Sequence, residues 1–235
     1  MYKAPVEEIA FTLKHVAGMG RAMDEGILGD LSADVVDAIL SEAGRFAGEE
    51  MEPLAEIGDK QGAKLVDGKV VLPDGWEKLY RDWTAGGWNG LTAPEEFGGQ
   101  GLPHMLNIAT LEMWNSASMA FGLAPTLTMG AVEALIAHGS DDLKTKYLAK
   151  LVSGEWSGTM NLTEPQCGTD LGMVRTKAVP NAATTAPIAS SARRSSSPGA
   201  IMRRPKTSSI SFLRACRMRL PARVGFRCSS CRNSS

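Results

Sequence analysis

The strongest candidates for a binding or catalytic role lie close together, within residues 160–170. Thr163 and Thr169 supply hydroxyl groups there. Pro165 and Gly168 favour a tight turn, because proline lacks a backbone donor and glycine permits close approach. A polar turn of this kind can present backbone N–H groups and hydroxyls to a flat, polar ligand. The same composition is also typical of a turn with a purely structural role, so the residues alone leave both interpretations open.

The elements before this turn must position it. Residues 154–159, Gly-Glu-Trp-Ser-Gly-Thr, predict the start of a β-strand that leads into the turn. Further upstream, apolar residues recur at helical spacing and predict helices over residues 5–23, 32–51, 76–85, 103–119, 121–138 and 141–151. Gly18 and Gly20 should end the first helix. Ser32 should cap the second, and Pro53 should stop it.

These patterns predict a mainly α fold. Residues 1–151 should form one helical domain, residues 152–180 the start of a β-domain, and residues 181–235 a separate tail. About 150 residues are enough to bury a sizeable core. Residues 58–73 are expected to form an exposed loop, with a short strand pairing within residues 64–72.

A second candidate for chemistry is the glycine-rich loop of residues 90–101. Such a loop could cradle a phosphate, but no Gly-Lys-Ser/Thr follows it, and Glu95 and Glu96 would repel an anion. We therefore interpret the loop as a tight connector between helices. A metal site is not expected, because His15, His104 and His138 have no partner at ligand spacing.

Both candidate segments resemble signatures of the acyl-CoA dehydrogenase family of flavoproteins. Residues 162–170, Leu-Thr-Glu-Pro-Gln-Cys-Gly-Thr-Asp, are similar to the family's Leu-Thr-Glu-Pro-x-x-Gly-Ser-Asp string. Residues 94–101, Pro-Glu-Glu-Phe-Gly-Gly-Gln-Gly, are similar to its Pro-Glu-Glu-Tyr-Gly-Gly-x-Gly loop. Residues 2–5 and 158–164 look most like the subgroup that acts on 3-(methylthio)propanoyl-CoA and related short thioesters. The likeness covers residues 1–180 directly.

The resemblance implies an acyl-CoA dehydrogenase-like N-terminal helical domain, followed in the family by a middle β-domain and a C-terminal helical bundle. It implies an oxidoreductase of fatty acid metabolism that acts on CH–CH donors: α,β-dehydrogenation of an acyl-CoA thioester, with hydride transfer to FAD. Electrons would pass to an electron-transfer flavoprotein, and intact members are typically homotetramers.

The resemblance also assigns the cofactor-binding residues by position. Met160, Leu162 and Thr163 would line the isoalloxazine ring of FAD, with the Thr163 hydroxyl near its polar edge. Gly168 would give room where flavin meets acyl-CoA, and Thr169 would donate a hydrogen bond there. The catalytic carboxylate belongs to the family's C-terminal bundle, so the resemblance places no catalytic residue in this chain. Cys167 is interpreted as a structural thiol, because nothing nearby in the sequence lowers its pKa.

The charge of the chain divides sharply. All 26 Asp and Glu residues lie in residues 1–170, which carry a formal charge of −14, whereas residues 171–235 carry +13. The N-terminus lacks a signal-peptide core, and we find no apolar run of about 20 residues that would span a membrane. We therefore expect a cytoplasmic chain with no membrane or nucleic-acid partner.

The tail, residues 181–235, is best explained as an out-of-frame translation. If each codon takes the last base of one triplet and the first two of the next, residues 227–234 can be re-read as Ser-Leu-Phe-Leu-Val-Pro-Lys-Phe. Residues 192–203 and 206–222 give similar apolar runs in the same frame, resembling strands that follow the signature in the family. We infer a one-base deletion near codons 180–182, a disordered tail, and a truncated, inactive form of the enzyme.

Two alternatives stay open. One is an acyl-CoA oxidase-like flavoenzyme, which shares the fold and the flavin but passes electrons to oxygen. The other is a helical interaction module whose basic, serine-rich tail binds nucleic acid or anionic lipid. The shifted frame removes the main support for the second alternative, and nothing in the sequence discriminates the first.

Overall fold

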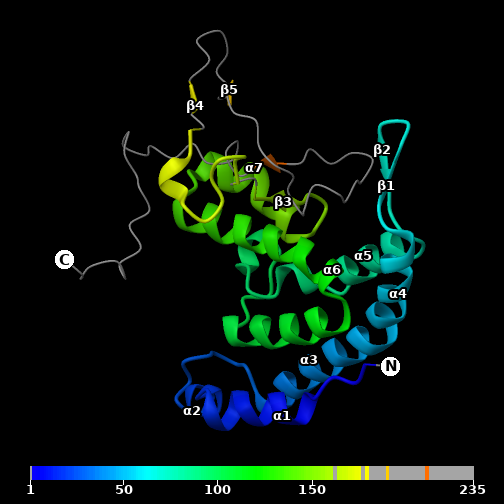
Figure 1. Cartoon of the computed structure of the whole chain (residues 1–235). Coiled ribbons are helices and arrows are strands. Elements are labelled where there is room, and N and C mark those ends of the chain that lie inside the picture. The colour runs from blue at the N-terminus through cyan, green and yellow to red at the C-terminus, as the bar shows by residue number, and fades with distance from the viewer. Residues whose placement is uncertain (1, 161–162, 176–177, 180–188, 191–209, 212–235) are drawn as a thin grey trace, which may run out of the picture.

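The structure, a computed structural model, describes residues 2–160, 163–175, 178–179, 189–190 and 210–211. Within them the chain is mostly helical, which confirms the mainly α prediction (Figure 1). The helices are α1 (Val6–Phe11), α2 (Met19–Asp24), α3 (Ala33–Phe46), α4 (Glu52–Gln61), α5 (Trp76–Ala85), α6 (His104–His138) and α7 (Asp141–Val152). The described residues also form two π-helical turns, η1 (Thr12–Val16) and η2 (Ala47–Met51). They form three 3-10 turns as well: η3 (Trp88–Gly90), η4 (Glu95–Phe97) and η5 (Leu171–Met173).

The described strands are short and form three separate pairs. The strands are β1 (Lys64–Val66), β2 (Lys69–Val71), β3 (Gly158–Thr159), β4 (Ala178–Val179), β5 (Ala189–Ser190) and β6 (Ile210–Ser211). β1 and β2 form the antiparallel hairpin predicted within residues 64–72. β3 pairs in parallel with β6, and β4 pairs antiparallel with β5. The predicted strand at residues 154–159 is therefore confirmed only for its last two residues.

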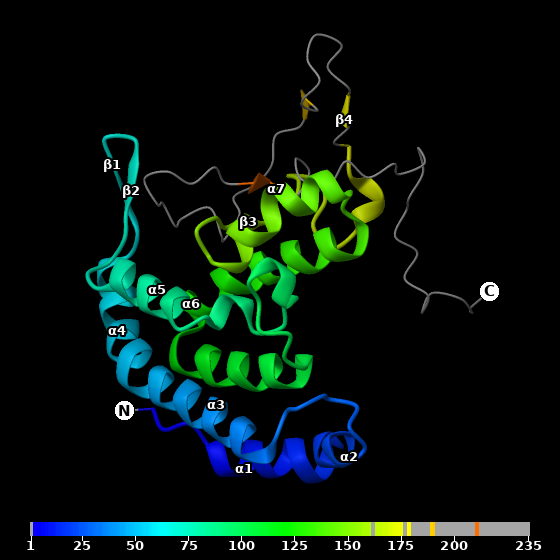
Figure 2. The ribbon, with the colours of Figure 1, turned by 180° about the vertical axis from the view of Figure 1, so that it is seen from behind.

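The helices stack from one end of the molecule to the other. In both views, α1 and α2 lie at one end, α3 lies beside them, and α7 and β3 lie toward the opposite end (Figures 1 and 2). The β1–β2 hairpin projects away from the helices in both views. The candidate turn that follows β3 thus lies at the end of the helical stack farthest from α1.

The first predicted helix, residues 5–23, is divided in two. The helical backbone of α1 continues through η1 to Val16, and Gly18 then takes a φ of 85°. Glycine adopts this left-handed conformation without a steric penalty, so the chain turns and restarts as α2. The predicted stop at Gly18 is confirmed, but a helix follows it to Asp24.

The predicted end of the second helix at Pro53 is wrong. Ser32 does cap α3, since its hydroxyl accepts a hydrogen bond of 3.4 Å from the N–H of Val35. The chain then widens into the π-helical turn η2 and continues as α4, with Pro53 in the first turn. A proline is tolerated in the first turn of a helix because no N–H is needed there. The predicted exposed loop accordingly begins after Gln61 rather than at residue 58.

α6 combines the two helices predicted over residues 103–119 and 121–138. Its backbone is helical from His104 to His138 except at Ser118, where φ is −158° and ψ is 89°. The Nδ1 atom of His104 lies 3.6 Å from a carboxylate oxygen of Glu133. A straight helix would separate these residues by about 44 Å at 1.5 Å per residue, so the kink must fold the second half back on the first.

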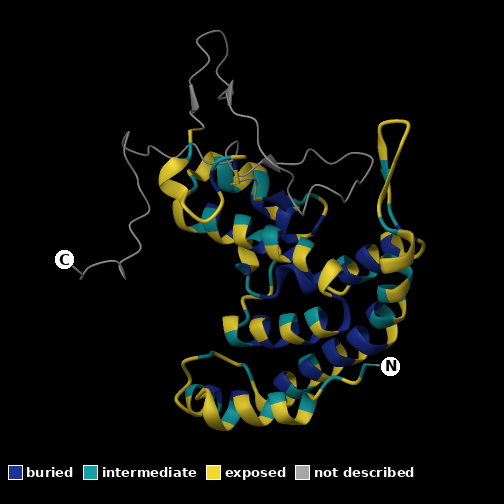
Figure 3. Ribbon diagram, viewed as in Figure 1, coloured by how far each residue is buried: buried dark blue, intermediate teal, exposed yellow. Residues whose placement is uncertain are grey.

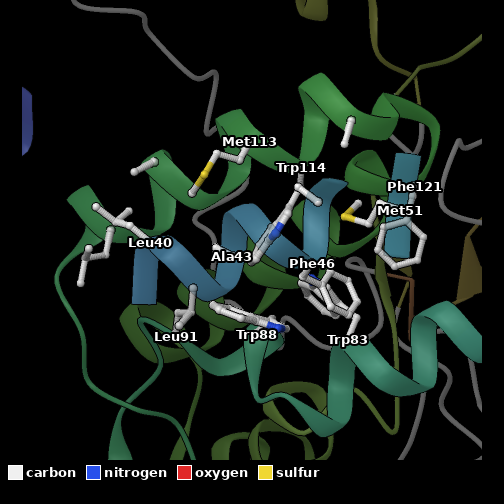
Figure 4. Packing of buried hydrophobic residues seen from close by; sticks show 14 of the residues in the cluster. Leu40, Ala43, Phe46, Met51, Trp83, Trp88, Leu91, Met113, Trp114 and Phe121 are labelled. Carbon is white, nitrogen blue, oxygen red and sulfur yellow. The ribbon is translucent and has the colours of Figure 1, made fainter. Parts of the chain in front are cut away.

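Aromatic side chains fill the main core between α3, α5 and α6 (Figure 4). The ring centroids of Trp83 and Trp114 lie 5.5 Å apart, and those of Trp88 and Trp114 lie 5.3 Å apart, both edge to face. Phe121 packs edge to face on Trp83 as well. Buried residues line the facing sides of these helices, while the projecting hairpin is exposed or half-buried (Figure 3).

α6 is long and apolar enough, by length and composition alone, to cross a membrane. Core helices of globular proteins pass the same test. Here α6 is kinked at Ser118, and it buries Met113, Trp114 and Phe121 in the aromatic core. Packing therefore accounts for part of its apolar character, while Ile108 and Met119 on the same helix are exposed.

Candidate functional site

The strand that leads into the candidate turn is seated on the second half of α6. The Thr128 hydroxyl, which is buried, accepts a hydrogen bond of 3.1 Å from the N–H of Gly158. A Cβ atom at Gly158 would lie 2.7 Å from that of Ala131, which is too close for any side chain. Glycine is therefore required here for the strand to approach the helix, and α6 fixes where the turn begins.

The end of α7 is held by residues from α5 and η3. The Asn89 side chain donates hydrogen bonds to the carbonyl oxygens of Leu151, at 2.5 Å, and Val152, at 3.2 Å. The Tyr80 hydroxyl donates to the carbonyl of Gly154 at 3.0 Å. Carbonyls at a helix end have no intrahelical partner, so these side chains satisfy them. The helical domain thereby anchors the segment that runs from α7 into β3.

The turn itself is a tight reversal centred on Pro165 and Gln166. Glu164 and Cys167 exchange two backbone hydrogen bonds of 2.9 Å, as an antiparallel pair does. Thr163 and Gly168 flank this pair, one on each side of the reversal. The predicted turn is confirmed with Pro165 at its centre, whereas Gly168 lies just outside the reversal.

Cys167 is buried, with 2% of its surface exposed, and its thiol donates to the carbonyl of Asp170 at 3.1 Å. The Asp170 carboxylate in turn accepts a hydrogen bond of 2.9 Å from the N–H of Gly172, which caps the 3-10 turn η5. These contacts are internal to the loop. They agree with the interpretation of Cys167 as a structural thiol.

The predicted cofactor residues that the structure describes lie on the exposed side of this turn. Met160 is 55% exposed, and Thr163, Gly168 and Thr169 are exposed as well. Leu162 lies outside the described residues. A Cβ atom at Gly168 would meet nothing within 4 Å, and its φ is not positive. No contact with the described part of the chain therefore requires glycine at this position.

The glycine-rich loop of residues 90–101 is a connector, as predicted. It is closed by backbone hydrogen bonds from Gln100 to Gly90, at 2.9 Å, and from Leu102 to Leu91, at 2.8 Å. Gly90 also lets the loop pack on α7, because a Cβ there would lie 3.0 Å from Val152. Among the described residues, no group of three or more His, Cys, Asp or Glu side chains could hold a metal ion.

Comparison with known proteins decides the family. Residues 34–155 match the family model described as "Acyl-CoA dehydrogenase, N-terminal domain", which is more than half of the chain.

The chain belongs to the acyl-CoA dehydrogenase family.

Relatives and solved structures of acyl-CoA dehydrogenases agree. The chain is 48% identical over 179 residues to 3-methylmercaptopropionyl-CoA dehydrogenase of Ruegeria pomeroyi, which covers 76% of this chain and 30% of that enzyme. It matches butyryl-CoA dehydrogenase of Megasphaera elsdenii with a TM-score of 0.54 and 24% identity, over 65% of this chain and 38% of that one. It also matches an FAD complex of PigA with a TM-score of 0.52 and 25% identity, over 65% and 37% of the two chains. The chain thus spans about a third of the length of each of these three proteins.

The structural roles of several residues that build the site were not predicted from the sequence. Asn89 lies between glycines that predicted only a break, and Thr128 lies within a helix predicted from its apolar neighbours. Glu164 was part of the recognised signature, but its burial gives no signal in a single sequence. An Asn among helix breakers does favour capping, and that signal could have identified Asn89.

Proposed function

We propose that this chain carries the N-terminal, flavin-facing part of an FAD-dependent acyl-CoA dehydrogenase. One observation carries the proposal: a polar turn with the family's signature is fixed to the helical domain, and it leaves Met160, Thr163, Gly168 and Thr169 exposed.

The described residues fit a flavin. Met160 offers an apolar side chain that suits the face of an aromatic ring, and Thr163 and Thr169 offer hydroxyls and backbone groups for the polar edge. The open space at Gly168 allows a ligand to approach the backbone, which a side chain would block. Met160, Leu162 and Thr163 would hold the ring, with Gly168 and Thr169 at the boundary between flavin and thioester.

The protein and the cofactor divide the chemistry. When bound, FAD accepts the hydride that leaves the β-carbon of an acyl-CoA thioester. The residues of this chain bind and orient: the hydroxyl of Thr169 would donate a hydrogen bond, and the helical domain would exclude water from one side. The family's catalytic carboxylate lies in a C-terminal bundle that this sequence does not match.

The finer assignments are extensions of the same proposal. The similarity to 3-methylmercaptopropionyl-CoA dehydrogenase favours a short acyl thioester as substrate of the intact enzyme. Membership of the family favours an electron-transfer flavoprotein as acceptor and a homo-oligomer. A cytoplasmic location stays a proposal from the N-terminal sequence alone. We propose further that this 235-residue chain is a truncated form with little or no dehydrogenase activity, because the match spans 30% of the length of 3-methylmercaptopropionyl-CoA dehydrogenase.

The test is retention of flavin by the purified chain. We expect that the chain, mixed with FAD and gel-filtered, keeps a flavin absorbance spectrum but does not reduce a dye when short acyl-CoA is added. A colourless protein would contradict the flavin site. Acyl-CoA-dependent dye reduction would contradict the inactivity, and peroxide formation in its place would favour the oxidase alternative. Resequencing the gene across codons 180–182 tests the inferred deletion separately.

A further inference from the structure

Glu164 is a buried carboxylate in a loop whose described residues, apart from Glu164 and Cys167, are exposed or half-buried. Only 3% of its surface is exposed, whereas Thr163 before it and Pro165 after it are exposed. Taking a carboxylate out of water carries a large free-energy cost unless hydrogen bonds replace the lost solvent. The contacts of this side chain should therefore indicate what the loop gains from it.

The carboxylate joins two distant points of the loop. One oxygen, Oε2, accepts a hydrogen bond of 2.9 Å from the backbone N–H of Arg175, 11 residues further along the chain. The same oxygen accepts a hydrogen bond of 2.6 Å from the Gln166 side chain. The Gln166 amide also reaches the carbonyl of Met173 at 3.4 Å. Glu164 thus closes the base of a loop that runs from residue 164 to residue 175.

This closure acts on the exposed groups of the candidate flavin site. Thr163 directly precedes Glu164, and Gly168 and Thr169 lie within the closed loop. Two kinds of contact set their backbone positions. Two backbone hydrogen bonds hold the reversal at Pro165 and Gln166, and the Glu164 carboxylate holds the base of the loop. A binding group placed even about 1 Å away from its productive position loses much of its effect.

We propose that Glu164 is a positioning residue for FAD: its buried carboxylate closes the loop of residues 164–175 and so holds Thr163, Gly168 and Thr169 in the arrangement that binds the flavin. This inference rests on the proposed function, since it concerns the same site. In this proposal Glu164 does not touch the flavin. It acts through the loop backbone that carries Thr163, Gly168 and Thr169.

The experiment compares three variants of the full 235-residue chain. Glu164→Ala removes the acceptor, while Glu164→Gln keeps an amide oxygen of the same reach, which can accept both hydrogen bonds that converge on Oε2. Glu96→Ala removes an exposed carboxylate from η4 and is the matched control. We measure the dissociation constant of FAD by quenching of flavin fluorescence, and the far-UV circular dichroism of each variant.

We expect Glu164→Ala to weaken FAD binding about tenfold or more, because a charged acceptor with two donors is lost. Glu164→Gln should bind within about threefold of the parent chain, Glu96→Ala should match the parent chain, and all four proteins should keep the same helical signal. Rescue by glutamine distinguishes positioning by hydrogen bonds from a requirement for charge. Equal FAD affinity in the parent chain and in Glu164→Ala would overturn the inference while leaving the proposed function intact.

Hydrogen exchange of the FAD-free chain separates the two possible failures. The amides of Gly172 and Arg175 should be protected in the parent chain and in Glu164→Gln, and should exchange faster in Glu164→Ala. Unchanged exchange in Glu164→Ala would overturn the inference, whatever the flavin does. A parent chain that binds no FAD overturns the proposed function and, with it, the positioning of flavin groups.

Discussion

Gly99, which lies two residues after η4 in the connector to α6, is the residue whose replacement should destabilise this fold most directly. A Cβ atom there would collide with the carbonyl group of Ala93 and would lie 2.7 Å from the Ala93 side chain. The Ala93 carbonyl also accepts the N–H of Gly101 at 2.9 Å, so the backbone cannot move away without losing that bond. We expect Gly99→Ala to lower the free energy of unfolding by about 2 kcal/mol or more.

Gly130, on the exposed side of α6, is the matched control for this substitution. A Cβ atom there meets nothing within 4 Å. Alanine has a higher helix propensity than glycine, so Gly130→Ala should raise the free energy of unfolding by up to about 1 kcal/mol. Thermal and urea unfolding would measure both changes, and a Gly99→Ala variant as stable as the parent would show that the connector can rearrange.

The candidate site residues could be named from sequence, and their role stays a prediction, but the structural support around them could not be foreseen. Thr163 and Thr169 stand out by type and spacing, and they are exposed as a binding role needs. Asn89 and Thr128 act across 62 and 30 residues of sequence, respectively. Contacts at such separations depend on how helices pack, and local patterns in one sequence carry no information about that.

Among the elements, the β1–β2 hairpin depends most on a single turn. Asp67 and Gly68 connect the strands with positive φ angles of 49° and 71°, the conformation of the favoured two-residue hairpin turns. Gly68→Val should disrupt this turn, because a β-branched residue is strained at positive φ. The amides of residues 64–71 should then exchange faster with solvent.

The same substitution should leave the helical core intact. The hairpin projects from the helices, and Leu65 is 75% exposed, so little buried surface is lost with it. The melting temperature should change by no more than about 2–4 °C, equivalent to about 1 kcal/mol for a chain of this size. A larger fall would mean that the hairpin packs against the core in solution.

Helix ends differed in how far local signals could predict them. Ser32 and Gly18 act through their own backbone or side chain, so their effects were visible in the sequence. At Pro53 the outcome depended on the wider turn η2 before it, which lets the chain continue with proline in the first turn of α4. The break predicted between residues 119 and 121 is confirmed within about two residues, because the backbone leaves the helical conformation at Ser118, and serine is a residue that disfavours helix interiors.

For the whole molecule, we expect stability to reside in residues 2–175. Among the described residues, the strands after Arg175 contribute the β4–β5 pair and the pairing of β6 with β3, each two residues long. Such short pairs add little stability. A chain ending at Arg175 should therefore melt within about 2–4 °C of the full chain, equivalent to about 1 kcal/mol.

Circular dichroism melts of the two chains measure this directly. A much lower melting temperature for the shorter chain would mean that residues after Arg175 are part of the fold, and would count against the inferred change of reading frame. The division of charge at residue 170 predicted such a boundary from composition alone. The proposed domain limits of 1–151, 152–180 and 181–235 stay a prediction.

The kink in α6 also bears on how fast the chain can fold. His104 and Glu133 lie 3.6 Å apart in space and 29 residues apart in sequence. Because this separation is short, the two halves of α6 form a helical hairpin of low contact order. Loop closure over such a short distance loses little chain entropy, and local helical contacts form faster than strand pairings between distant segments. The α6 hairpin is thus suited to be an early folding nucleus, on which α3, α5 and finally β3 can assemble.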